Sequence, residues 1–286
     1  MKRLFSTLRD AGVRFSRDGC AFLAQAVAFN ALFALFPLVV LIVTLASYIY
    51  PNAEHRVLAF FDAMMPALHD FILANLQSYI YGRGISSIIA LIFILWSGKN
   101  LFMGLTVALD RSLNVPKGRP FFHSVLLSIV MLPAIGTLLI VAMALPISLS
   151  LIMAIANITD RQNLTHFSAY LISIVLVFAI SMTLYRFLPN KKLTWAFALP
   201  GASVTALSWP VLQFAFTQYT LHVPFSHIYG ALSVPLVLLL WFYVIGSIVL
   251  YGAEFCAAWA ARNHSGADLL DGADPRRAAP IVLERH

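Results

Sequence analysis

The chain has 286 residues, of which 60% are hydrophobic and only 11% are charged. Soluble domains carry about 25% charged residues, so this composition excludes an ordinary soluble enzyme and indicates a polytopic membrane protein. The formal net charge of +7 is compatible with nucleic-acid binding, but the placement of the basic residues along the chain gives it another explanation.

Residues 1–20 form a basic segment ahead of the first long apolar run. Five basic residues alternate there with apolar side chains and two aspartates, a pattern typical of a short helix lying on an anionic membrane surface. A plain topogenic leader explains the same residues equally well. The side chains expected to contact anionic inner-leaflet lipids are Lys2, Arg3, Arg9, Arg14 and Arg17.

Six apolar stretches follow within residues 21–262. Each is long enough to cross the hydrocarbon core of a bilayer, because a helix rises about 1.5 Å per residue. The predicted spans are 21–50, 85–109, 123–156, 166–188, 195–221 and 230–260. The sequence therefore predicts an all-α, six-span membrane protein.

Two further segments lie outside these spans. In residues 54–83, apolar side chains recur at three- and four-residue spacing and the charges fall elsewhere, which predicts an amphipathic helical segment on the outer, periplasmic side. Residues 263–286 combine Gly, Pro and Ala with mixed charges, and this composition predicts a disordered cytoplasmic tail.

The basic residues predict the orientation of the spans. If the N-terminus is inside, fifteen of the 19 Lys and Arg residues flank inner span ends, and only Arg56, Arg83 and Arg161 lie outside. This bias predicts that both termini face the cytoplasm of a bacterial inner membrane. It also accounts for the net charge without a nucleic-acid partner.

One carboxylate stands near the inner end of the last span. Glu254 follows a run without Asp, Glu, Lys or Arg from residue 230, and an acid at such a position requires a partner or a watery cavity. Lys99 is one candidate partner, although the spacing along the two spans leaves about 15 Å between them. The competing candidates are Arg111 and Arg262 at the inner rim, where Asp110 also lies.

The polar residues within the spans have two interpretations. They form a polar pocket open to the inner leaflet, or their amides serve only as hydrogen-bonding contacts between helices. A separate pattern in the fifth span, with Ala198, Ala202 and Ala206 at four-residue spacing, predicts a close helix contact. The residues predicted for the substrate pocket are Glu254, Lys99, Asn100, Gln25 and Asn30.

Four blocks of the sequence resemble the YihY/BrkB family of bacterial inner-membrane proteins. They are FNALFALFPLVVLIVTLAS, WSGKNLFMGLTVALDRSLNV, LYRFLPNKKLTWAFALPGASVTALSW and YGALSVPLVLLLWFYVIGSIVLYGAEFCA. The resemblance implies a six-span helical fold and an inner-membrane location. It implies no settled activity, and the ribonuclease BN label once given to the family is a misassignment. Glu254 matches the family's GAE block, whereas Phe29 and Asn30 replace its aromatic hydroxyls.

Motifs for catalysis are missing from the sequence. It contains no P-loop, no GxSxG, no HExxH and no paired-carboxylate motif, so we expect neither an enzyme nor a bound metal or cofactor. The preferred function is a transporter or flippase-like protein for a lipid or another amphiphilic or anionic solute. The alternative is a non-catalytic membrane scaffold or partner-binding subunit, and either function is compatible with an oligomer.

Overall fold

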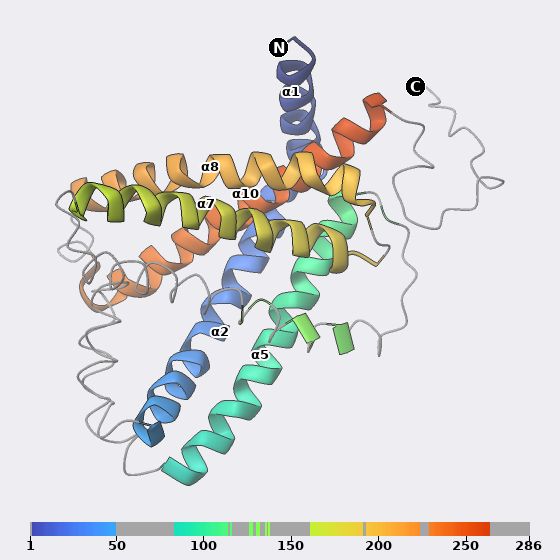
Figure 1. The fold of residues 1–286 in the computed structure, drawn as a ribbon. Coiled ribbons are helices and arrows are strands. Elements are labelled where there is room, and N and C mark those ends of the chain that lie inside the picture. Colours follow the sequence, from blue (N-terminus) through green and yellow to red (C-terminus); the bar gives the residue numbers. More distant parts are fainter. Residues whose placement is uncertain are drawn as a thin grey trace.

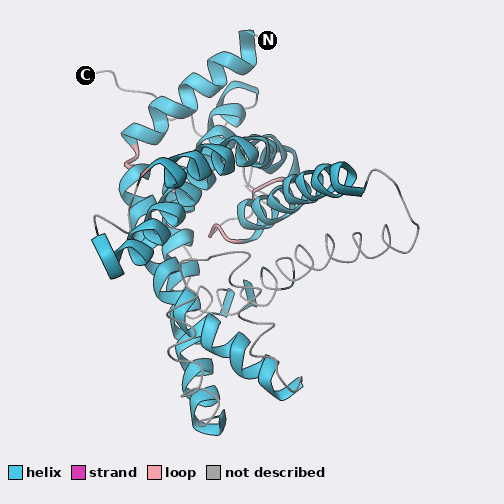
Figure 2. Ribbon diagram, turned by 90° about the vertical axis from the view of Figure 1, so that its left-hand side faces the viewer, coloured by secondary structure: helices cyan, strands magenta, loops and turns pink. Residues whose placement is uncertain are grey.

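The computed structural model describes residues 2–49, 83–113, 115, 126–127, 130–131, 135, 137, 161–190, 193–223 and 229–263. The regular elements within these residues are helices (Figure 2), which confirms the all-α class for this part of the chain. Nearly all of the predicted segment 54–83, of the predicted span 123–156 and of the predicted tail 263–286 lies outside the described residues. That the chain crosses the membrane six times therefore stays a prediction.

The described residues form six α-helices (Figure 1). Each of them except the first covers one of the stretches predicted to span the membrane. The helices are α1 (Lys2–Arg17), α2 (Cys20–Ile49), α5 (Arg83–Ser112), α7 (Arg161–Phe187), α8 (Trp195–His222) and α10 (Ser233–Asn263), and a 3-10 turn, η2 (Gly230–Leu232), precedes α10.

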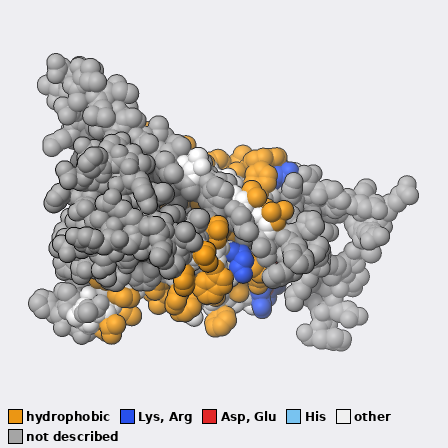
Figure 3. Space-filling view, turned by 90° about the horizontal axis from the view of Figure 1, so that it is seen from below, with side chains coloured by type: hydrophobic (Ala, Val, Ile, Leu, Met, Phe, Trp, Pro, Cys, Tyr) orange, Lys and Arg blue, Asp and Glu red, His pale blue; other side chains and the backbone are white. Residues whose placement is uncertain are grey.

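Two helices among the described residues are long and apolar enough to cross a membrane. They are Trp195–Thr220 in α8 and Ser233–Arg262 in α10. A third candidate is the bent pair Leu4–Arg17 and Cys20–Leu35, whose axes differ by 71°. On the face shown in Figure 3, the described side chains are mainly hydrophobic, with a few basic side chains among them. Such a surface suits contact with lipid.

The bend between α1 and α2 is produced by Gly19. Its φ of 70° lies in the left-handed region, which glycine adopts without the steric cost that a Cβ imposes. The amide of Gly19 donates to the Ser16 carbonyl at 3.3 Å, and the amide of Asp18 donates to the Arg14 carbonyl at 2.8 Å. The basic segment therefore leaves the first span at a sharp elbow instead of continuing it.

Helix α2 runs antiparallel to α5. Near the start of α2, Cys20 Sγ lies 3.4 Å from Ser112 Oγ at the end of α5. Further along α2, Asn30 packs on Gly104, where an added Cβ would lie 3.1 Å from Asn30 Nδ2. Because the numbers rise along α2 as they fall along α5, the two helices point in opposite directions, as in the ribbon of Figure 1.

Helix α2 also runs antiparallel to α10. Cys20 contacts Glu254, and Ala24 packs on Gly246, where an added Cβ would lie 3.4 Å from the Ala24 carbonyl oxygen. These contacts place the beginning of α2 beside the end of α10. Helix α2 is thus held between α5 and α10.

Where α8 and α10 cross, their backbones lie so close together that only glycine fits at positions 201 and 252. A Cβ on Gly201 would overlap Cys256 Sγ and the Gly252 carbonyl oxygen, and a Cβ on Gly252 would overlap Thr205 Oγ1 and the Tyr185 hydroxyl. Close backbone approach provides van der Waals contact, which holds membrane helices together where lipid removes the hydrophobic driving force. The predicted small-residue face is confirmed as buried at Ala198, Ala202 and Ala206.

Tyr185 joins α7 to this crossing. Its side chain is fully buried, and its hydroxyl donates to the Val249 carbonyl at 2.7 Å and lies 2.8 Å from Thr205 Oγ1. One hydroxyl therefore links α7, α8 and α10. A polar group without such partners would be costly in this environment.

The helix ends predicted to face the cytoplasm gather at one end of the structure. The turn after α7 meets the end of α5, because the amide of Asn190 donates to Asp110 Oδ1 at 2.8 Å and its side-chain amide donates to Oδ2. The start of α8 meets the end of α10 where Cys256 Sγ lies 3.9 Å from the Ala198 carbonyl oxygen. This arrangement agrees with alternating helix directions.

Candidate functional site

A buried ionic cluster lies where the α1–α2 elbow meets the end of α10. We call it the elbow cluster and define it as Arg14, Cys20, Ser112 and Glu254. These residues come from α1, α2, α5 and α10 respectively. The left-handed turn at Gly19 brings Arg14 back over the end of α10, so four helices contribute to one site.

Glu254 is the centre of the elbow cluster. Its side chain has 0% exposure, and Arg14 Nε donates to its Oε2 at 3.0 Å. The Cys20 thiol donates to the other oxygen, Oε1, at 3.2 Å. Both carboxylate oxygens are therefore bonded, which offsets the cost of burying the charge.

Arg14 makes a second, longer contact within the elbow cluster. Its Nη2 lies 3.5 Å from the Ser112 carbonyl oxygen at the end of α5, while 19% of its side chain remains exposed. A cation near the last carbonyls of a helix also interacts favourably with the helix dipole. Arg14 thus links α1 to both α5 and α10.

Two further contacts fix α1 on α10. Arg262, near the end of α10, forms an ion pair with Asp10 and donates to the Ser6 hydroxyl. The Tyr251 hydroxyl donates to the Leu8 carbonyl at 2.9 Å. The side of α1 that carries these contacts therefore packs on α10.

The cation paired with Glu254 differs from the predicted ones. We expected Lys99, Arg111 or Arg262, and the structure pairs Glu254 with Arg14. Lys99 precedes the α5 residue of the elbow cluster, Ser112, by about 20 Å along the helix axis at 1.5 Å per residue.

The other two expected cations have different surroundings. Arg111 is exposed near the end of α5, and Arg262 is bonded to Asp10. Asp110, also predicted as an inner-rim charge partner, accepts hydrogen bonds from Asn190. Arg14, expected to face lipid, points instead into the elbow cluster.

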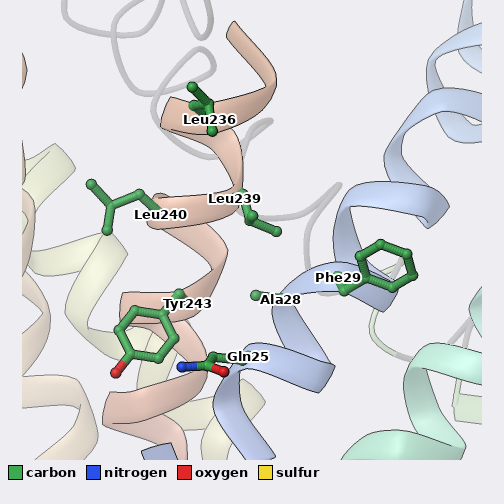
Figure 4. A pocket seen from close by; sticks show the side chains of 7 residues that line it. All are labelled: Gln25, Ala28, Phe29, Leu236, Leu239, Leu240 and Tyr243. Carbon is green, nitrogen blue, oxygen red and sulfur yellow. The ribbon is translucent and has the colours of Figure 1, made fainter. Parts of the chain in front are cut away.

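A groove of about 440 Å³ lies between α2 and α10, separate from the elbow cluster. Figure 4 shows Gln25 and Tyr243 near one end of it and Leu236 near the other. We call it the α2–α10 groove. Its lining residues are Gln25, Ala28, Phe29, Leu236, Leu239, Leu240 and Tyr243.

The residues predicted for one polar pocket are divided between different places. Gln25 lines the α2–α10 groove, and Glu254 belongs to the elbow cluster. Asn30 donates to the Ala26 carbonyl at 3.0 Å and packs on α5. Lys99 and Asn100 are half-buried on α5.

Sequence reasoning did not identify Arg14 or Tyr243 as site residues. The signal for Arg14 is its position six residues before Cys20, just ahead of the glycine that turns the chain. Tyr243 carries no comparable signal, because it is one of ten tyrosines in the chain and belongs to no motif. Within the described ranges, no group of three His, Cys, Asp or Glu residues is arranged to hold a metal ion.

Comparison with known proteins extends the sequence resemblance. The family model for virulence factor BrkB matches residues 11–277. The UPF0761 membrane protein VSAL_I2938 of Aliivibrio salmonicida is 29% identical over 257 residues, which cover 86% of this chain and 80% of that protein. The ribonuclease-like protein YfkH of Bacillus subtilis is 25% identical over 239 residues, which cover 81% of this chain and 86% of that protein.

No solved structure matches the chain at a significant level. The family match nevertheless begins within α1, covers the other described helices and ends beyond α10. It confirms the resemblance of the four sequence blocks. The chain therefore belongs to the BrkB family of membrane proteins.

Proposed function

We propose that this protein carries a lipid or another amphiphile between the two leaflets of the bacterial inner membrane, with both termini in the cytoplasm. The α2–α10 groove holds the alkyl chain of the cargo, and Gln25 and Tyr243 contact its polar group. This is the flippase-like function expected from the sequence, now assigned to one groove.

The lining of the α2–α10 groove is the observation that carries the proposal. Five of its seven residues are apolar, and the two polar ones lie near one end (Figure 4). An alkyl chain matches the apolar part, and a headgroup matches the polar end. The groove volume of about 440 Å³ falls within the range typical of small-molecule sites, about 300–1,000 Å³.

The chemistry of the polar end favours a particular class of headgroup. Gln25 and Tyr243 are uncharged groups that both donate and accept hydrogen bonds. Glu254 lies in the elbow cluster with both its oxygens bonded, so its charge is not available to the groove. The groove therefore suits a hydroxyl-bearing or amide-bearing headgroup better than a strongly anionic solute.

The position of Gln25 supports access from the inner leaflet. It follows the start of α2 by five residues, which is about 7.5 Å along the helix. In the predicted orientation that depth is close to the inner headgroup region. An amide exposed on a membrane helix is costly unless a polar partner reaches it, and a headgroup would supply that partner.

A translocation assay on reconstituted vesicles tests the proposal. Vesicles with an acyl-labelled fluorescent glycolipid, whose headgroup carries hydroxyl groups and no charge, in both leaflets are treated with a membrane-impermeant quencher, and the rate of loss of the protected fluorescence is measured. We expect Gln25→Leu and Tyr243→Phe each to slow translocation about fivefold, the effect of losing one hydrogen bond worth about 1 kcal/mol.

Gln213→Leu is the matched control. Gln213 is exposed on α8 and does not line the groove, so the same substitution there should leave the rate unchanged. Folded wild-type protein that translocates no faster than protein-free vesicles would overturn the transport function and favour the membrane scaffold. If Gln25→Leu and Gln213→Leu slow translocation equally, the α2–α10 groove is not the site that binds the cargo.

A further inference from the structure

Helix α1 has an outward surface that the elbow cluster and the α2–α10 groove do not use. Four residues at four-residue spacing, Phe5, Arg9, Val13 and Arg17, lie on one side of the helix and are all exposed. Phe5 is 74% exposed and Val13 is 61% exposed. We call these four residues the outer stripe of α1.

The opposite side of α1 is fully occupied. Thr7 and Ala11 are buried, and Arg14 is bonded to Glu254. The basic residues of α1 are thus divided, because Arg14 points inward while Arg9 and Arg17 remain on the outer stripe. Large apolar and basic side chains therefore alternate along the outer stripe, and no other described part of the protein covers them.

The angle at the elbow places this stripe relative to a bilayer. The axis of α1 differs by 71° from that of α2, which is predicted to span the membrane. Spanning helices tilt about 20° from the bilayer normal on average, so α1 lies much closer to the membrane plane than to the normal. The contacts of Arg14 and Arg262 hold α1 in this direction.

We infer that the outer stripe of α1 binds the surface of a membrane that contains anionic phospholipids. Phe5 and Val13 enter the boundary between headgroups and acyl chains, and Arg9 interacts with lipid phosphates. Arg17 contributes less charge, because its Nε is bonded to Asp18 Oδ1 at 3.1 Å. This inference does not depend on the transport function, since it concerns another surface.

Hydrogen exchange of the full-length protein in lipid nanodiscs tests the inference. Amide exchange of residues 2–17 is measured by mass spectrometry in discs of phosphatidylcholine alone and in discs with about 30% phosphatidylglycerol. We expect slower exchange in the anionic discs, and we expect about 0.5 M salt to remove the difference by screening. Equal exchange in the two lipid compositions would overturn the inference.

Charge variants identify the residue responsible. Arg9→Gln should reduce the slowing by anionic lipid about fivefold, the factor that corresponds to one basic residue near such a surface. Arg9→Lys, which keeps the charge, and Arg276→Gln, which removes one charge outside α1, should both retain it. The same slowing by inorganic phosphate in phosphatidylcholine discs would contradict recognition of a lipid surface.

Discussion

Replacing Arg14 with methionine is expected to destabilise the folded protein by about 3–5 kcal/mol, the range measured when one partner of a buried ion pair is removed. The substitution leaves the Glu254 carboxylate with 0% exposure and without its cation. The Cys20 thiol, a weak donor, would be its remaining side-chain partner. The change in unfolding free energy is measured by titrating the detergent-solubilised protein with SDS.

Glu254→Gln should cost less than Arg14→Met. Glutamine keeps the shape of the side chain and carries no charge, and the released guanidinium of Arg14 is already 19% exposed and can turn towards water. Arg14→Lys is the charge-preserving control and should lie between the wild type and Arg14→Met. An Arg14→Met cost below about 1 kcal/mol would show that the pair does not hold α1 in place.

The double variant Arg14→Met, Glu254→Leu separates two physical effects. Replacing both members of a buried pair with apolar residues is often neutral or stabilising, because it removes the desolvation cost together with the attraction. We expect the double variant to recover most of the stability that Arg14→Met loses. If the double variant remains as unstable as Arg14→Met, desolvation of the charges is not the main cost. The lost stability then comes from the hydrogen bonds that Arg14 donates to Ser112 and that Glu254 accepts from Cys20.

Gly201→Val should force α8 and α10 apart and destabilise the protein by about 3 kcal/mol, at the upper end of the range for overpacked cores. Even the first carbon of the new side chain would overlap the backbone oxygen of Gly252, which cannot move aside like the tip of a long side chain. The same SDS titration measures the loss, and disulfide cross-linking between introduced cysteines on the two helices measures their separation.

Gly12→Ala is the matched control for this crossing. An added Cβ at Gly12 meets no atom within 4 Å, and the residue lies within α1. Alanine is the better helix former by about 0.5–1 kcal/mol, so this variant should be neutral or stabilising. If Gly201→Val were equally harmless, the close α8–α10 crossing would not exist in the membrane.

The two ion pairs and the hydroxyl contact between α1 and α10 have a consequence for any movement of α1. Detaching α1 requires breaking the pairs at Glu254 and at Asp10 together with the Tyr251 hydrogen bond. The elbow cluster, the Asp10–Arg262 pair and the Tyr251 hydrogen bond therefore hold α1 on α10 together. Glu254 is better explained by this structural role than by direct contact with a transported molecule.

The positions of the helices were predictable from the sequence because they depend on local chemistry. Long apolar runs become helices in lipid, where every backbone polar group needs an internal partner. Gly19 precedes α2 and Pro224 follows α8 in the sequence, whereas Pro200 and Pro210 lie inside α8 and do not end it. The face of Ala198, Ala202 and Ala206 was predictable for the same reason, since its spacing lies within one helix.

The partner of Glu254 was not predictable in this way. The apolar run around Glu254 indicates a buried acid that needs a cation, because an unpaired charge in an apolar helix is too costly. Arg14 and Glu254 are separated by 240 residues. The expected depth of Glu254 in its span gives no information about the position of α1, whose axis differs by 71° from that of α2. The pairing with Arg14 follows from the folded arrangement, because it depends on the direction that the chain takes at Gly19 and on the contact of α1 with α10.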